Sequence, residues 1–186
     1  LYMEVNQGLT ALFSRLSFSL EPGLAVSAKV NIPDVTEDFG FVAFGIAAPP
    51  TGETSRMGPV IACGLDRSSS VTKRVCTFTV DGGNTSTEIF GRQELNFAGK
   101  DLTFVISLGE GTAEGTILGE GVDFHFSGPF TPPVQALPLF MGAFALSDAD
   151  ILGAKWDDLV TNEPLSHHPA YEMSSSPLAV DGMPFD

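Results

Sequence analysis

The sequence has few basic residues. It contains only 9 Lys and Arg residues against 23 Asp and Glu residues, which gives a formal net charge of −14. A protein that binds nucleic acid or an anionic membrane surface needs a basic face, and so few basic side chains cannot easily supply one. We therefore expect no nucleic-acid partner. The acidity favours solubility, and it is equally compatible with a salty habitat or with cation binding.

Long hydrophobic runs are also missing. The longest apolar stretches, at residues 39–48 and 137–146, are well short of the roughly 20 residues that a membrane-spanning helix needs. We therefore expect no membrane insertion. Residue 1 is Leu, and no charged and then apolar start typical of a signal peptide is present. This start favours a chain that has been processed or trimmed.

Charged residues make up only 17% of the 186 residues, whereas hydrophobic residues make up 43%, which excludes a disordered chain. A chain of this length can bury a substantial core as one domain. Aromatic side chains are dominated by 15 Phe, with one Trp and two Tyr. The 20 Gly and 13 Pro are scattered along the chain, a distribution typical of many short strands joined by turns.

Hydrophobic periodicity predicts an all-β domain. Several segments alternate polar and apolar residues, which is typical of half-buried strands, and the segment at residues 39–46 is apolar on both sides, which indicates a central strand. We expect strands at residues 16–20, 25–32, 39–46, 60–65, 75–80, 90–92, 95–97, 102–108, 115–118, 122–126, 139–146 and 154–161. No segment reads as a convincing helix. Roughly ten to twelve strands suit an antiparallel two-sheet sandwich or jelly roll.

The chain divides into a predicted sandwich domain at residues 1–162 and an extended C-terminal tail at residues 163–186. The tail contains four Pro and three consecutive Ser, and it has little periodicity. By itself it cannot bury enough apolar surface to offset the entropy lost on ordering. We therefore expect it to pack on the domain or on a neighbouring subunit.

The two cysteines fall in one predicted hairpin. Cys63 and Cys76 lie in strands that flank a turn near residues 68–71, and both are equally distant from the middle of that turn. This pairing would place the thiols opposite one another, so that a cross-strand disulfide could form in an oxidising compartment. The alternative is that both are small buried residues with free thiols.

Three segments resemble those of the concanavalin A-like sandwich, in particular laminin-G-like modules of secreted proteins. The first, VSAKVNIPDVTEDFGFVAFGIAA, resembles the paired strands of such modules, and VIACGLDRSSSVTKRVCTFTV resembles their following hairpin. The third, LPLFMGAFALSDADILGAKWDDLVTN, is similar to their C-terminal strand pair. Together they cover about residues 26–162. The resemblance implies a jelly-roll sandwich and a glycan-binding or adhesive role. Related hydrolases use paired carboxylates spaced Glu-x-Asp-x-x-Glu, and this spacing is absent here.

Two histidine-containing motifs are candidates for catalytic or metal sites. Asp123, His125 and Ser127 alternate on one predicted strand, a row that invites comparison with a hydrolase triad. The three residues would lie in a line, however, with no nucleophile elbow, so a solvent-facing row above inward-pointing Val and Phe residues is favoured. His167 and His168 adjoin a proline in the tail without a further ligand at metal spacing, which favours a structural or solvated role.

Acidic pairs near the C-terminus are the best candidates for a metal site. Asp148 and Asp150, with Asp157 and Asp158, could supply oxygen ligands to calcium, although no complete ligand loop is visible. The alternative is ordinary acidic surface. Asn84 begins an Asn-Thr-Ser sequence that fits the N-glycosylation pattern.

The sequence is compatible with three functions. The absence of a catalytic motif and the mean hydropathy of +0.18 favour a non-catalytic structural or interaction subunit of an extracellular or virion-surface assembly, with other copies of itself or neighbouring proteins as partners. The first alternative is a lectin-like, glycan-binding adhesion module. Sugar-binding modules often stack the sugar on an exposed Trp or Tyr ring, and the chain offers only Trp156, Tyr2 and Tyr171 for this role. The second alternative is a secreted polysaccharide hydrolase or lyase.

Overall fold

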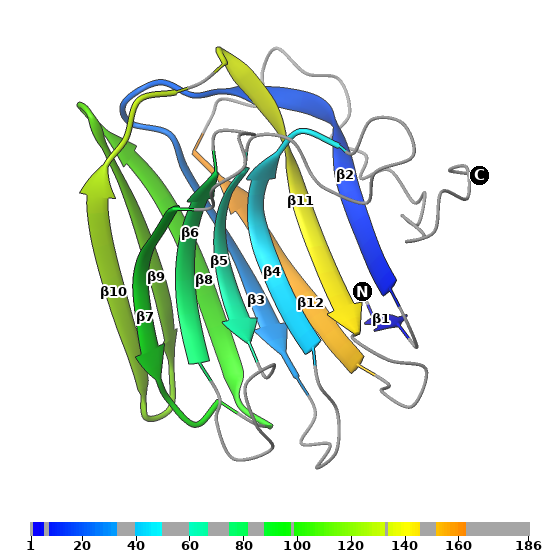
Figure 1. Cartoon of the computed structure of the whole chain (residues 1–186). Helices are drawn as coiled ribbons and strands as arrows, with labels where there is room; N and C mark the ends of the chain where they lie inside the picture. Colours follow the sequence, from blue (N-terminus) through cyan, green and yellow to red (C-terminus); the bar gives the residue numbers. More distant parts are fainter. Residues whose placement is uncertain are drawn as a thin grey trace.

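The computed structural model is a sandwich of two antiparallel β-sheets that lie face to face (Figure 1). Twelve strands are formed among the described residues, and no described segment is helical. The all-β, two-sheet prediction is therefore confirmed. The structure describes residues 2–5, 8–32, 40–49, 60–66, 75–81, 88–97, 99–132, 134–145 and 152–162.

Each sheet has six strands. The first sheet, sheet A, has the order β1 (Tyr2–Val5), β12 (Leu152–Thr161), β3 (Ala25–Asn31), β8 (Asp101–Gly109), β9 (Thr112–Gly119) and β10 (Val122–Pro129). The second, sheet B, has the order β2 (Gly8–Ser19), β11 (Ala136–Ala145), β4 (Gly40–Ala47), β5 (Val60–Asp66), β6 (Val75–Asp81) and β7 (Glu88–Glu94). Five of the ten neighbouring pairs join strands that are not consecutive in the chain, so the fold depends on long-range pairing.

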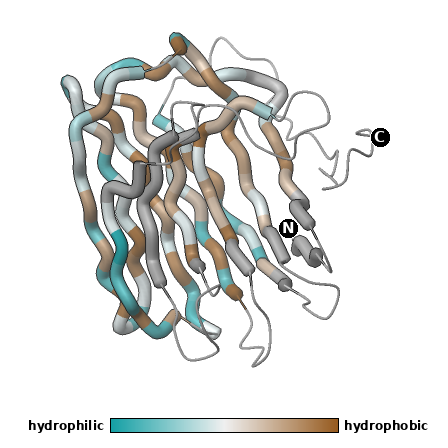
Figure 2. The backbone as a smooth tube through the Cα atoms, in the orientation of Figure 1, coloured by the Kyte–Doolittle hydropathy of each residue, from teal (hydrophilic) through white to brown (hydrophobic). Residues whose placement is uncertain are grey.

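Alternation on the strands of sheet A, most regular on β8, separates a core face from a solvent face. On β8, Leu102, Phe104, Ile106 and Leu108 are buried, and the residues between them are exposed or half-buried. The same alternation appears as changing hydropathy along the chain in Figure 2. Successive side chains of a strand point to opposite faces, so one face of sheet A packs on sheet B and the other is left for solvent.

Trp156 lies in the core between the sheets. Its ring lies edge-on to Phe104, with centroids 6.1 Å apart, and tilted against Phe44 at 6.4 Å. The side chain is only 3% exposed. These aromatic contacts join β12 and β8 of sheet A to β4 of sheet B, and they hold β12 against the core.

The central strand β4 is buried on both faces, as its apolar sequence predicts. Val42, Phe44 and Ile46 belong to the core between the sheets, whereas Ala43 and Ala47 belong to a second buried cluster on the other face of sheet B. In that cluster the rings of Phe13 and Phe140 stack at 6.0 Å. The short alanine side chains leave room for these two rings.

Several predicted boundaries need correction. The strand expected at residues 90–92 lies within the longer β7, the one expected at residues 95–97 is not formed because β7 ends at Glu94, and the sequence did not predict β1. Phe126 was expected inside the sandwich, but it is 36% exposed. Phe126 lies at the sandwich edge against Gly91 of β7, and its ring is so close that a Cβ atom on residue 91 would overlap it.

The expected opposition of the two cysteines is wrong. In the β5–β6 ladder, Cys63 lies opposite Phe78, and Leu65 lies opposite Cys76. The β5–β6 ladder is centred one residue later in the chain than a pairing of Cys63 with Cys76 needs, and such a shift moves each cross-strand partner by two positions. The thiol of Cys63 is buried in the core, with Sγ 3.5 Å from the carbonyl oxygen of Val105. The side chain of Cys76 lies outside the described residues.

The predicted domain boundary and tail remain predictions. Strands extend from residue 2 to residue 161, whereas the tail at residues 163–186 lies outside the described residues. Within the described part of the chain there is no helix with the length and hydropathy needed to cross a membrane.

Candidate functional site

The solvent face of sheet A carries a continuous set of polar side chains. Residues directly opposite one another in an antiparallel ladder share a face, so the register of five neighbouring strands defines rows across this face. The rows run Lys155, Asn31, Asp101; then Asp157, Lys29, Thr103, Leu118, Asp123; and then Val160, Ser27, Val105, Thr116, His125. Most members are polar, in contrast to the buried apolar cluster on the outer face of β2, β11, β4 and β5 in sheet B.

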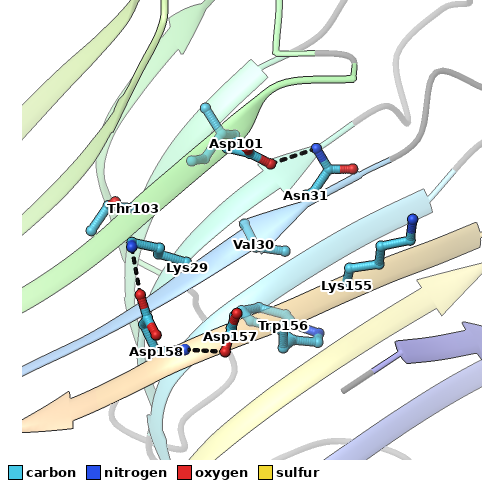
Figure 3. A pocket seen from close by; sticks show the side chains of 10 residues that line it. Lys29, Val30, Asn31, Asp101, Thr103, Lys155, Trp156, Asp157 and Asp158 are labelled. Atoms are coloured by element: carbon cyan, nitrogen blue, oxygen red, sulfur yellow. Dashed lines mark hydrogen bonds and ion pairs between the residues drawn. The ribbon is translucent and has the colours of Figure 1, made fainter.

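A groove of about 810 Å³ crosses this face over β12, β3 and β8. Figure 3 shows its polar lining, with Lys29 and Asn31 from β3, Asp101 and Thr103 from β8, and others from β12. Inward-pointing residues such as Val30 and Trp156 contribute to its floor. The volume lies within the range of small-molecule sites, roughly 300–1,000 Å³. We refer to it as the sheet A groove.

A β-bulge shapes one side of the groove. The β12–β3 register shifts between Asp157 and Val160, so that Asp158 and Leu159 together face the single residue Ala28. Asp158 has a φ of 46°, the only positive φ of a non-glycine residue in the described part of the chain. A bulge bends a strand and re-aims its side chains, and an aspartate tolerates this left-handed conformation better than most residues do.

The bulge brings an acid and a base together at the groove. The carboxylate of Asp158 forms an ion pair with the ammonium of Lys29, with 2.5 Å between Oδ2 and Nζ, and both side chains are 55% exposed (Figure 3). The hydrogen bond to Asp158, followed by its negative charge, raises the pKa of Lys29 above its ordinary value. The backbone N–H of Asp158 also donates to the carboxylate of Asp157.

A second polar pair lies at the other end of the groove. The side-chain amide of Asn31 donates to the carboxylate of Asp101 at 2.8 Å and to the carbonyl oxygen of Gly99 at 3.3 Å. These bonds orient an amide and a carboxylate side by side on neighbouring strands. Lys155 is exposed beside them and has no ion pair within the part of the chain that the structure describes.

Trp156 cannot act as a sugar platform in this structure, because its ring is buried beneath the groove rather than exposed in it. The alternation of β12 turns Trp156 inward and its neighbours Lys155 and Asp157 outward. Of the other two predicted platforms, the side chain of Tyr2 and the whole of Tyr171 lie outside the described residues.

The row of Asp123, His125 and Ser127 lies on the solvent face of β10, as predicted, with all three side chains exposed. The imidazole Nδ1 of His125 lies 3.0 Å from the hydroxyl of Thr116 on the neighbouring strand. Ser127 and Asp123 lie opposite Glu114 and Leu118. The three side chains therefore form a line across separate rows of the sheet rather than converging on one point.

Of the four predicted calcium ligands, Asp157 and Asp158 line the sheet A groove, and Asp148 and Asp150 lie outside the described residues. No group of three acidic, histidine or cysteine residues with metal-site spacing occurs within the described ranges. The calcium site stays a prediction. Asn84, His167 and His168 also lie outside the described residues.

Sequence reasoning missed the groove as a site. Its residues come from three strands that are far apart in sequence, at Lys29 and Asn31, at Asp101 and Thr103, and at Lys155 to Asp158. Each segment shows the outward-pointing polar alternation of a half-buried strand. The strand order that joins them had no signal in the sequence.

No protein-family model matches the chain, and no curated protein sequence matches it. Solved structures do match. A legume lectin-like domain from Entamoeba histolytica has a TM-score of 0.58 and 8% identity, over 88% of this chain and 90% of that chain. Congerin II with lactose and MES has a TM-score of 0.52 and 11% identity, over 82% of this chain and 99% of that chain.

The fold is a concanavalin A-like jelly-roll sandwich. The CBM2 module of the evolved Dit of Lactobacillus casei BL23 phage J-1 matches with a TM-score of 0.56 and 14% identity over 78% of this chain. The match covers 66% of the phage module. An alginate lyase from Pseudomonas aeruginosa matches with a TM-score of 0.55 and 11% identity, over 78% of this chain and 66% of that chain. At such identities the likeness establishes the fold alone.

Proposed function

We propose that the chain is a non-catalytic carbohydrate-binding module that holds a neutral oligosaccharide in the sheet A groove. The observation that carries this proposal is the paired polar lining of a groove open across three strands. Support also comes from the solved structures of similar fold, which include a lectin-like domain, a lactose-liganded congerin and a phage CBM2 module.

The lining chemistry suits sugar hydroxyls. A hydroxyl group both donates and accepts hydrogen bonds, carboxylates accept and ammonium groups donate, and an amide does both. Asn31 and Asp101 are held side by side by their mutual bond, so they can engage adjacent hydroxyls of one sugar ring with little further ordering. Such preorganisation lowers the entropic cost of binding.

The charges favour a neutral ligand over a polyanion. The groove is lined by three aspartates and two lysines, and one lysine, Lys29, is already paired with Asp158. The net charge of the chain is −14. An acidic polysaccharide would therefore meet a repulsive field.

The sequence-based interpretation as a structural or interaction subunit stays a prediction, and it is compatible with glycan binding. The likeness to a phage module supports an extracellular or virion-surface setting, in which a sandwich both joins an assembly and holds a sugar. The hydrolase or lyase alternative receives less support, since Asp123, His125 and Ser127 do not converge.

A glycan array that contains neutral and uronate oligosaccharides tests the proposal, followed by calorimetry on the best ligand. Hydrogen bonds to a charged group contribute roughly 1.5–3 kcal/mol, so Asp101→Ala should weaken binding about tenfold or more. Ser127→Ala, an exposed change on the same face over β10, is the matched control and should bind normally. Binding with and without a calcium chelator tests the metal prediction.

Failure of every neutral glycan to bind would contradict the proposal, as would equal losses in Asp101→Ala and Ser127→Ala. The non-catalytic part has its own test. Incubation with the bound glycan and with alginate should leave chain length unchanged, and shortened or unsaturated products would show that the chain is an enzyme.

A further inference from the structure

The two sheets have four edges, and three of them carry features that oppose pairing with another strand. β1 has only four residues. The ladder of β2 with β11 is irregular, because three residues of β2 lie between the partners of Pro138 and Phe140. In β7, one extra residue interrupts the ladder with β6. Short strands and bulges are known devices that protect a sheet edge from unwanted pairing.

The fourth edge, β10, lacks these features. It has eight residues, and its ladder with β9 is unbroken from Val122 to Pro129. It contains no lysine, and its proline is the last residue of the strand. Within the described part of the chain no strand pairs with its outer side. A regular edge of this kind is a template for strand addition.

The direction of the free backbone groups follows from the hydrogen bonds. The N–H of Phe130 donates to the carbonyl oxygen of Gly111, so the even-numbered residues of β10 bond to β9. Antiparallel pairs alternate between bonded and non-bonded positions. The backbone groups of Asp123, His125 and Ser127 therefore point away from β9, toward the open edge.

We infer that β10 is the interface of a two-fold dimer, in which it pairs antiparallel with β10 of a second copy, centred on His125. This register uses all three outward-pointing residues. His125 meets His125 of the second copy, and Asp123 meets Ser127, so that a hydroxyl donor faces a carboxylate acceptor. Pro129, which has no N–H to offer, falls beyond these bonded positions.

The second copy also explains an exposed aromatic side chain. Phe126 is 36% exposed at the edge of the sandwich, whereas Phe124 is 2% exposed. The same register places Phe126 opposite Phe124 of the second copy, where pairing would cover part of its ring. Burial of aromatic surface at the centre of an interface favours association.

The dimer would join two copies of sheet A into one continuous sheet. Directly opposite residues share a face, so both sheet A grooves would lie on the same side of it. If the proposed function holds, the dimer would present two sugar sites in one plane and gain from bivalent binding. The dimer itself does not depend on that function.

Light scattering after size-exclusion chromatography tests the interface. The wild-type chain should have twice the monomer mass of 19.6 kDa, and His125→Lys should shift it to the monomer by placing two lysines together on the axis. The matched control is Gln93→Lys, the same introduced charge at an exposed residue of the bulged edge strand β7, which should leave the dimer intact. Circular dichroism confirms that both variants fold.

A cysteine at the axis tests the register. Residues at a bonded antiparallel position have Cα atoms about 5.5 Å apart, which is within disulfide range. Under mild oxidation, His125→Cys should form a covalent dimer, whereas Thr116→Cys on β9 and the wild-type chain should not. A monomeric wild-type chain at all concentrations, or a dimer that survives His125→Lys, would overturn the inference. Because no sugar is present, these outcomes are independent of the proposed function.

Discussion

Asp158 reaches Lys29 because β12 bulges between them in the ladder. The carboxylate comes from a residue with φ of 46°, and it pairs with an ammonium from the neighbouring strand β3. Without the extra residue of the bulge, regular alternation would turn Asp158 toward the core, on the same face of β12 as Trp156. The bulge instead keeps two successive acidic residues, Asp157 and Asp158, in the groove.

This ion pair predicts a raised pKa for Lys29, caused first by the hydrogen bond and then by the charge of Asp158. The stabilisation is fully present below the ordinary lysine pKa of about 10.4, and it is lost as the pH rises through the raised value. In an NMR titration, Asp158→Asn should lower the pKa of Lys29. Asp157→Asn should lower it less, because Asp157 is a smaller cause. Equal pKa values in wild type and Asp158→Asn would refute the pairing.

The left-handed conformation of Asp158 predicts a difference between two uncharged replacements. Both Asp158→Asn and Asp158→Ala remove the ion pair, but asparagine tolerates a positive φ and alanine does not. Chemical denaturation should find Asp158→Ala less stable than Asp158→Asn by about 1 kcal/mol. Asp157→Asn and Asp157→Ala, at the preceding exposed position, provide the control pair and should differ less. No difference at position 158 would mean that the bulge relaxes without cost.

Much of the fold could be predicted from local pattern. The alternation of residues 25–32 and 102–108 predicted both β3 and β8, and the apolar run at residues 39–46 predicted a central strand. These strands can be predicted because an alternation with a period of two residues is visible within a single segment, without knowledge of its neighbours in space. β1 was missed because four residues are too few to show a period.

The register of the strands and their order in each sheet could not be predicted from the sequence. Counting from the predicted turn centre places Cys76 opposite Cys63, whereas Phe78 lies there in the structure. A one-residue error in the turn centre is enough to cause this difference. The groove depends on β12, β3 and β8 being neighbours, and loop lengths do not determine that order. The outward position of Asp123, His125 and Ser127 needed only alternation, and it was predicted correctly.

Close packing between the sheet edges predicts an energetic coupling between Gly91 and Phe126. A Cβ at Gly91 would overlap the Phe126 ring, so Gly91→Ala should destabilise the protein by about 1–3 kcal/mol. In a Phe126→Ala background the same change should cost at least about 1 kcal/mol less. Denaturant unfolding of the four proteins completes the cycle. Additive effects would show that the two residues do not touch.

Trp156 is the single tryptophan, so its fluorescence reports on the core beneath the groove. Because the side chain is 3% exposed, the folded protein should emit at short wavelength and resist quenching by acrylamide. Unfolding should shift the emission to longer wavelength and restore quenching. Efficient quenching of the folded protein would contradict the buried position, and it would return Trp156 to the role of an exposed sugar platform.

The location of the sugar site is tested most directly by NMR chemical-shift mapping with the best neutral oligosaccharide from the array. The largest amide shifts should fall on the groove strands, around Lys29, Asn31, Asp101 and Lys155, and they should be much smaller in Asp101→Ala at the same ligand concentration. Shifts confined to the outer face of sheet B or to the sandwich-end loops, with the groove residues unchanged, would show that the sheet A groove is not the sugar site.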